Sequence, residues 1–202
     1  MERVELRTRR LVLTAPGPDD VDTITALCQD ADVQRWTTVP SPYDREHAVG
    51  FVAATAQKWH EGTSLTWALR AAAGSPAPAV LGMVGLHDID DGEAEIGYWL
   101  GRPHRGAALM AEAVDAVCGF GFRELALQRI TWHAFIPNVG SASVARAAGF
   151  RFEGTVRLGA PQRGVRRDEW QAGLLADDVR PGGTDAATGW PAESFGVQGA
   201  ST

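Results

Sequence analysis

The stretch EIGYWLGRPHRGAALMAEAV, residues 95–114, is the feature that most constrains what this chain can fold into. Ile96, Tyr98 and their neighbours favour a half-buried strand. A short turn rich in glycine and arginine follows. Residues 107–117 then predict a helix, because good helix formers place apolar side chains at three- and four-residue spacing. The sequence therefore predicts a strand that turns sharply into a helix.

The turn before that helix has the properties of an anion site. A helix start carries free backbone N–H groups and the positive end of the helix dipole, which together favour a phosphate. Gly106, Ala107 and Ala108 are small enough for a ligand to approach the backbone, and Arg102 and Arg105 add positive charge. The stretch is neither a Walker loop nor a GxGxxG fingerprint. An ordinary turn with solvated arginines is the alternative.

Composition excludes several classes of function. The 202 residues suit one domain, and the net charge of −6 argues against broad nucleic-acid binding but is compatible with a cationic substrate such as an amine. No apolar run approaches the ~18 residues of a membrane span, and no signal peptide is evident, so we expect a cytoplasmic protein.

No His, Cys or Asp cluster has metal-ligand spacing, so no metal is expected. Cys28 and Cys118 fit buried, free thiols.

The order of predicted elements is β-α-α-β-β-β-α-β-α-β-β, an α/β domain on a mostly antiparallel sheet. Strands are expected at 4–14, 65–71, 80–87, 94–100, 127–136 and 168–175, and another strand begins at 150. Helices are expected at 21–28, 44–59, 107–117 and 138–148, and a short further helix ends at 36. Residues 71–79 predict a hairpin loop. Residues 1–180 form this domain. Residues 181–202 are rich in small residues and Pro, and predict a disordered tail that catalysis does not need. Docking at one point is the alternative, with Trp190 and Phe195 as its only anchors.

Several of these segments together resemble one family. The chain is similar to the GNAT superfamily of acyl-CoA-dependent N-acyltransferases, and within it to the RimJ/RimL type, which acetylates protein N-termini. The resemblance covers about residues 4–180. It rests on LRTRRLVLT, LGMVGLHDI, EIGYWL with RGAALMAEAV, NVGSASVARAAGFRFEG and RRDEWQAGLLADD, which occur in the expected order.

The resemblance implies a mixed, mostly antiparallel sheet with helices on both faces and a splayed strand pair that receives acetyl-CoA. The backbone amides that would hold the pyrophosphate belong to Arg105, Gly106, Ala107, Ala108 and Leu109. The pantetheine arm would lie along Trp99 and Leu100, on a bulged strand that diverges from its neighbour. Asn138 would contact this arm, and Ser141 would lie near the thiol.

The sequence departs from the family pattern at two positions. Ala108 replaces the usual second glycine of the loop, and Ala145 stands where related enzymes often carry a tyrosine general acid. RimJ/RimL-like members commonly lack that tyrosine. Ser141 is then the nearest candidate to assist the departing thiolate.

Amine acyl transfer also needs a route for the amine's proton. An α-amino group has a pKa of ~7.7–8.0 and a lysine ~10.4, so an N-terminal amine is partly neutral at pH 7. Glu95 and His133 are the candidate bases. The alternative for Glu95 is a solvated residue at a strand end, and the alternative for His133 is a hydrogen-bonded histidine of the sheet. Trp36, Tyr43 and Trp59 lie in the region that shapes the acceptor pocket in this family, although core packing is the expected role for any one of them.

Two classes of function remain open. The chain is an N-acetyltransferase, or it is a regulatory or pseudoenzyme domain that binds CoA without turnover. The acceptor is a protein N-terminal α-amine, a polyamine, an aminoglycoside or another small amine, and the acyl group is acetyl or larger. A homodimer is also left open.

Overall fold

The computed structural model describes residues 1–72, 79–178 and 189–196. The strands are β1 (Leu6–Arg7), β2 (Leu11–Thr14), β3 (Leu65–Ala71), β4 (Gly82–Asp90), β5 (Glu93–Leu100), β6 (Arg129–Phe135), β7 (Arg151–Gln162) and β8 (Val165–Leu175). The helices are α1 (Val21–Cys28), α2 (Ala31–Trp36), α3 (Arg45–Glu61), α4 (Leu109–Glu124) and α5 (Val139–Ala147), with short 3₁₀ turns η1 (Pro18–Asp20), η2 (Arg102–His104) and η4 (Ala192–Phe195).

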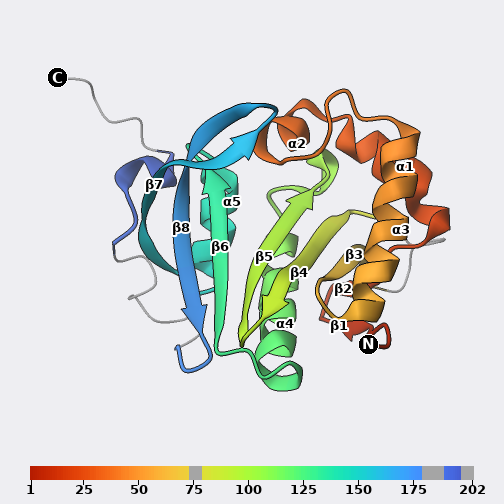
Figure 1. Ribbon diagram of the computed structural model, residues 1–202, viewed down its shortest axis with the longest axis horizontal. Coiled ribbons are helices and arrows are strands. Elements are labelled where there is room, and N and C mark those ends of the chain that lie inside the picture. Colours follow the sequence, from red (N-terminus) through yellow and green to blue (C-terminus); the bar gives the residue numbers. More distant parts are fainter. Residues whose placement is uncertain (73–78, 179–188, 197–202) are drawn as a thin grey trace.

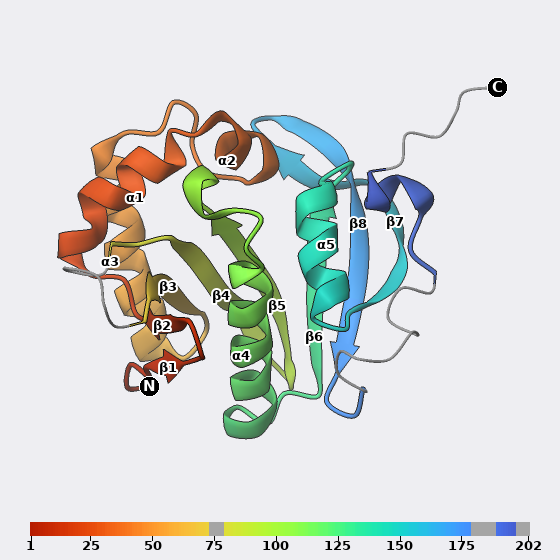
Figure 2. The same ribbon diagram turned by 180° about the vertical axis from the view of Figure 1, so that it is seen from behind.

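These strands form one sheet in the order β1-β2-β3-β4-β5-β6-β8-β7. Every neighbouring pair is antiparallel except β5 and β6. Helices α1 and α3 lie on one side of the sheet, and α4 and α5 cover the other side at β5 and β6 (Figures 1 and 2). The predicted α/β fold, with a mostly antiparallel sheet and helices on both faces, is confirmed.

Local sequence explains where the helices near the site begin and end. Asn138 caps α5, because its side-chain oxygen accepts a hydrogen bond from the Ser141 N–H at 3.1 Å. Asp44 caps α3 in the same way through the His47 N–H. Gly62 then ends α3 with a φ of +74°, a conformation that glycine adopts without strain.

The core joins the sheet to its helices. Trp59, Trp67 and Phe120 stack edge to face between α3, β3 and α4, and each is nearly fully buried. Trp59 is thus a core residue, which confirms core packing as its role. Cys28 and Cys118 are buried, and neither forms a disulfide, as expected.

The structure corrects the predicted strands at both ends of the sheet. The strand expected at 4–14 is two short strands, because the Thr8 hydroxyl bonds both backbone groups of Leu11 and turns the chain between them. At the other edge, β7 runs on to Gln162 and turns directly into β8. Arg163 and Gly164 both have positive φ, +48° and +80°, which matches a tight hairpin turn that the sequence analysis missed.

Part of the predicted tail docks on the domain. Trp190 is 7% exposed and packs against Trp132 and Phe152, while Arg146 of α5 donates to the Ser194 carbonyl at 3.0 Å. Residues 189–196 thus dock on the domain at one point with Trp190 as the anchor, which the sequence left open. Residues 181–188 and 197–202, and most of the hairpin loop expected at 71–79, lie outside the described residues.

A chain that ends at Arg180 should lose about 3 kcal/mol of unfolding free energy, because it gives up the buried Trp190 ring. Denaturant unfolding measures the loss. A chain that ends at Gly196 keeps the docked segment and should unfold like the full chain. Equal midpoints for the two truncations would contradict a stabilising role for this segment.

Candidate active site

The central strands separate where the site lies. The parallel register of β5 and β6 runs from Glu93 opposite Arg129 to Ile96 opposite Trp132, while the two strands continue to Leu100 and Phe135. Figure 1 shows them diverging beyond this point. The splayed strand pair is thus confirmed. The bulge expected on β5 lies instead on β4, where the register with β5 shifts between His87 and Asp90.

The turn between β5 and α4 has the backbone expected of an anion-binding loop. Gly106 and Ala108 have positive φ, +82° and +54°, and α4 begins at Leu109 rather than at the predicted 107. Ala108 precedes the helix in a left-handed conformation, so the first free N–H groups of α4 follow it directly. A Cβ added at Gly106 would meet no atom within 4 Å, so open space faces this position.

A first cavity of about 670 Å³ lies beside this loop, between α2, β5 and the starts of α4 and α5. Of the predicted acyl-CoA residues, it is lined by Trp99, Leu100, Arg105, Gly106, Ala108, Leu109, Asn138 and Ser141. Ala107 is not part of its lining, and the Ala107 carbonyl instead accepts from Arg10 at 2.8 Å. The structure therefore brings together all but one of these residues.

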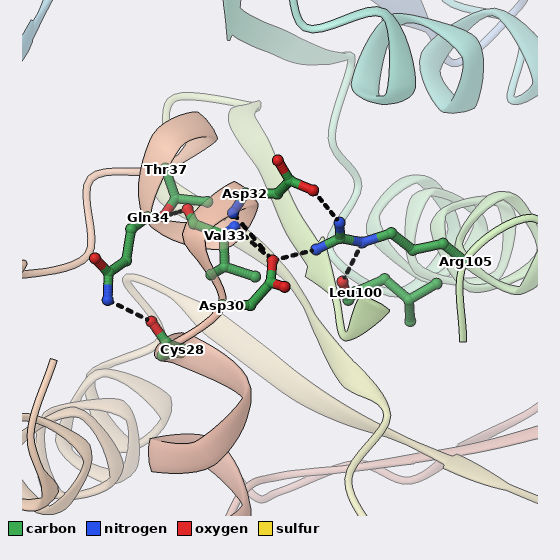
Figure 3. A network of polar contacts seen from close by, with 8 residues as sticks. All are labelled: Cys28, Asp30, Asp32, Val33, Gln34, Thr37, Leu100 and Arg105. Carbon is green, nitrogen blue, oxygen red and sulfur yellow. Dashed lines mark hydrogen bonds and ion pairs between the residues drawn. The ribbon is translucent and has the colours of Figure 1, made fainter. Parts of the chain in front are cut away.

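The Arg105 side chain is not a free phosphate ligand. Its guanidinium binds Asp30 and Asp32 at 3.0 Å each, and its Nε donates to the Leu100 carbonyl at 2.9 Å (Figure 3). This charge is paired with two carboxylates at the start of α2, so it is not directed at the loop alone. The arginine joins the loop to α2 instead.

Asp30 is held in its ionised form at this junction. Burial pushes its pKa upward, but hydrogen bonds from the Val33 N–H and Arg105, together with the guanidinium charge, bring the pKa below its ordinary value. The ion pair therefore persists at neutral pH.

Ser141 is fixed by two aromatic residues. The Trp132 indole N–H donates to Ser141 Oγ at 3.0 Å, and this hydroxyl donates to Tyr98 Oη at 3.2 Å. Tyr98 in turn donates to the Ser141 carbonyl at 2.8 Å. Burial raises the pKa of Tyr98 well above its ordinary range, so its hydroxyl stays protonated. Sequence reasoning treated Tyr98 only as a strand residue.

Tyr98→Phe should lower the unfolding free energy by about 1–3 kcal/mol, because both oxygens of Ser141 lose a buried partner. Thermal unfolding of the variant beside the unchanged chain measures this. A stability equal to that of the unchanged chain would show that the Tyr98–Ser141 contacts contribute nothing to the fold.

A second cavity of about 650 Å³ faces α3 and the loop after α2, and it contains both candidate bases, Glu95 and His133. His133 lies one residue beyond Trp132, the last residue of β6 that is paired with β5. Its Nδ1 is 3.2 Å from Oε1 of Glu169 on β8. Glu169 is only 8% exposed. An ionised Glu169 accepts from the Nδ1–H and leaves Nε2 of His133 with a lone pair.

Burial raises the pKa of Glu95, and the charges of Asp88 and Glu169 raise it further, while His133 opposes them. A carboxylate with a raised pKa in a cavity is a suitable proton acceptor. Trp36 and Tyr43 line the same cavity.

Sequence reasoning also missed His87 on β4. The Ser64 hydroxyl donates to the Leu86 carbonyl at 3.2 Å, so its oxygen accepts from Nδ1–H of His87 at 2.7 Å and Nε2 carries the lone pair. The ring lies over Gly97, where an added Cβ would be 3.1 Å from Nε2. Burial lowers the pKa of His87, which keeps it neutral.

Comparison with known proteins identifies the family. A sequence profile described as an acetyltransferase (GNAT) domain matches residues 10–151. The chain belongs to the GNAT acetyltransferase family. Among the described residues, no cluster of three or more His, Cys, Asp or Glu side chains could hold a metal ion, and no helix is long and apolar enough to cross a membrane.

Relatives and solved structures agree with this assignment. "Probable N-acetyltransferase YjcK" of Bacillus subtilis is 36% identical over 102 residues, which are 49% of this chain and 56% of that protein. "Uncharacterized N-acetyltransferase p20" of Bacillus licheniformis is 28% identical over 172 residues, 84% of this chain and 95% of that protein. The solved structure of RimL, the ribosomal L7/L12 α-N-protein acetyltransferase with coenzyme A, has a TM-score of 0.76 at 19% identity, covering 85% of this chain and 98% of RimL. It shows a shared fold.

Proposed function

We propose that this GNAT enzyme transfers an acetyl group from acetyl-CoA to a primary amine by direct attack in a ternary complex. The observation that carries the proposal is that the two cavities share part of their lining, including Tyr98, Trp99, Asn138 and Ser141. A thioester in the first cavity would meet an amine in the second at these residues. The names of its relatives and the coenzyme A bound to a protein of the same fold support acetyl-CoA as the donor.

The loop and the splayed strands supply the donor site in this proposal. The backbone N–H groups of Gly106, Ala108 and Leu109 would hold the pyrophosphate at the start of α4. The arm would extend along Trp99 and Leu100, whose strand has no register with β6 there. Backbone N–H groups on this edge of β5 could then stabilise the negative charge on the thioester oxygen.

The chemistry requires one proton to leave the amine and one to reach sulfur. The amine nitrogen bonds to the carbonyl carbon, the C–S bond breaks, and coenzyme A leaves as a thiolate that is then protonated. Glu95 or His133 would accept the amine's proton, directly or through water, and Glu169 would orient His133. Ser141 would assist the thiolate by turning its hydroxyl hydrogen from Tyr98 Oη to the sulfur, while its oxygen keeps the hydrogen bond from Trp132.

The test is thiol release from several acyl-CoA donors with a panel of peptides and small amines. We expect acetyl-CoA to support turnover with at least one primary amine. Tight acetyl-CoA binding by calorimetry without turnover on any member of the panel would instead indicate a CoA-binding domain that lacks activity.

A further inference from the structure

The second cavity has a preformed shape. On one side Gln162, at the tip of the β7–β8 hairpin, donates to the Arg35 and Thr37 carbonyls at 2.9 Å each, and Arg163 donates to the Gln34 and Val39 carbonyls. Figure 1 shows this hairpin reaching over to α2. On the other side Arg105 ties α2 to the acyl-CoA loop. The wall around the acceptor is thus braced from two directions.

Much of the wall of this cavity is apolar. Aromatic side chains come from α2, the loop after it, α3, β5 and β6: Trp36, Tyr43, Phe51, Trp99 and Phe135. Phe51 and Trp99 are only partly buried, so their faces are available to a ligand. A cavity of about 650 Å³ with such walls suits one compact ligand with an apolar body.

The described lining of the cavity holds carboxylates but no permanently positive side chain. Its described lining contains the carboxylates of Glu95 and Glu169 and three histidines, His47, His87 and His133, with no lysine or arginine. Arg35 and Arg167 stack on the cavity residues Trp36 and Phe135 but do not join the lining. An ammonium is therefore attracted here, while a carboxylate on the same ligand would meet the repulsion of Glu95 and Glu169 and no lysine or arginine partner.

We infer that the acceptor is a compact primary amine with one positive charge, an apolar body and no carboxylate beside the amine. This inference rests on the proposed function and narrows its acceptor. The ammonium faces Glu95 and Glu169, and the apolar body lies on the aromatic wall. A polyamine would have to bury a second charge against these rings, and a peptide would have to desolvate amide groups there.

Matched pairs of acceptors test the inference with acetyl-CoA as donor. Phenethylamine and phenylalanine, or isoamylamine and leucine, differ only in the carboxylate. Spermidine and tetrapeptides that begin with Ser or Ala complete the set. We expect kcat/KM to favour each amine over its amino acid by about 100-fold, the effect of like charges held a few ångströms apart. We also expect each amine to exceed spermidine and the peptides.

A matched pair of variants tests whether cavity charge causes this preference. Ala54 is an exposed α3 residue that lines the cavity, and Ala53 is exposed beside it but outside the lining. Ala54→Arg should shift the ratio of phenylalanine to phenethylamine turnover upward by about tenfold. Ala53→Arg adds the same charge to the same helix and should leave this ratio unchanged.

The outcomes separate this inference from the function on which it rests. Faster turnover of phenylalanine, spermidine or the peptides than of the two amines would overturn the inference and leave the acetyltransferase function intact. An equal change of the ratio in both arginine variants would also overturn it. No thiol release with any acceptor, despite acetyl-CoA binding, would overturn the proposed function and the inference together.

Discussion

Gly106→Asp is expected to abolish acetyl-CoA binding while the chain stays folded. No atom lies within 4 Å of a Cβ built at Gly106, so the larger side chain meets no obstacle in the free protein. The carboxylate would, however, enter the space assigned to the pyrophosphate. A like charge at about 4 Å costs about 4 kcal/mol per charge near a protein surface, which weakens binding about 1,000-fold.

Gly106→Asn is the matched control for this prediction. Asparagine has the same shape and tolerates the positive φ of +82° at this position, but it brings no charge. Calorimetry should detect acetyl-CoA binding to the Asn variant and not to the Asp variant. Acetyl-pantetheine lacks the pyrophosphate and should bind both variants alike. Unchanged acetyl-CoA affinity in Gly106→Asp would remove the phosphate role of this loop.

The strand, turn and helix from β5 to α4 were predictable because their signal is local. Strand residues, a glycine turn and a periodic helix follow one another within residues 95–117, so propensity and spacing are sufficient to find them. The helix start was misplaced by two residues, because Ala108 adopts a left-handed conformation that its residue type does not favour. The Asn138 cap was equally visible, since capping acts within one turn.

Contacts between distant segments could not be predicted. Tyr98 and Ser141 are 43 residues apart, and His133 and Glu169 are 36 residues apart. Arg105 and Asp30 are separated by 75 residues. The sequence around Arg105 therefore did not indicate that its guanidinium would pair with a carboxylate. Such pairs depend on strand order and register, which a single sequence does not specify. The site residues missed from sequence are of this kind.

Loss of the catalytic base is the second large effect that we expect. His133→Ala or Glu95→Gln should lower kcat/KM by about 10²–10⁴-fold with little change in acetyl-CoA affinity, because both side chains lie in the second cavity and neither lines the first. Glu93→Gln is the control for Glu95→Gln, since Glu93 lies on the same strand and contacts Arg129 at an exposed site. His60→Ala serves the same purpose for His133.

The pH profile separates the two candidates. A carboxylate base works only when ionised, so Glu95 would give a rate that rises with pH through its pKa, which burial places above the ordinary ~4.3 of glutamate. Glu95→Gln would then erase that rise. If His133 is the base, His133→Ala erases the rise. Because the acceptor amine also titrates, the comparison needs acceptors of different pKa.

Glu169→Gln distinguishes a positioned imidazole from a carboxylate base. A glutamine amide can donate to Nδ1 of His133, which would place the proton on Nε2 and remove the lone pair from the cavity. A drop in kcat/KM as large as that of His133→Ala, with unchanged stability, would therefore support His133 as the base. A normal rate for Glu169→Gln together with a slow Glu95→Gln would assign the role to Glu95. Near-normal rates for all three variants would exclude both Glu95 and His133 as the base. His87 would then become the base to test, because its Nε2 carries a lone pair and lies over Gly97 in the same cavity.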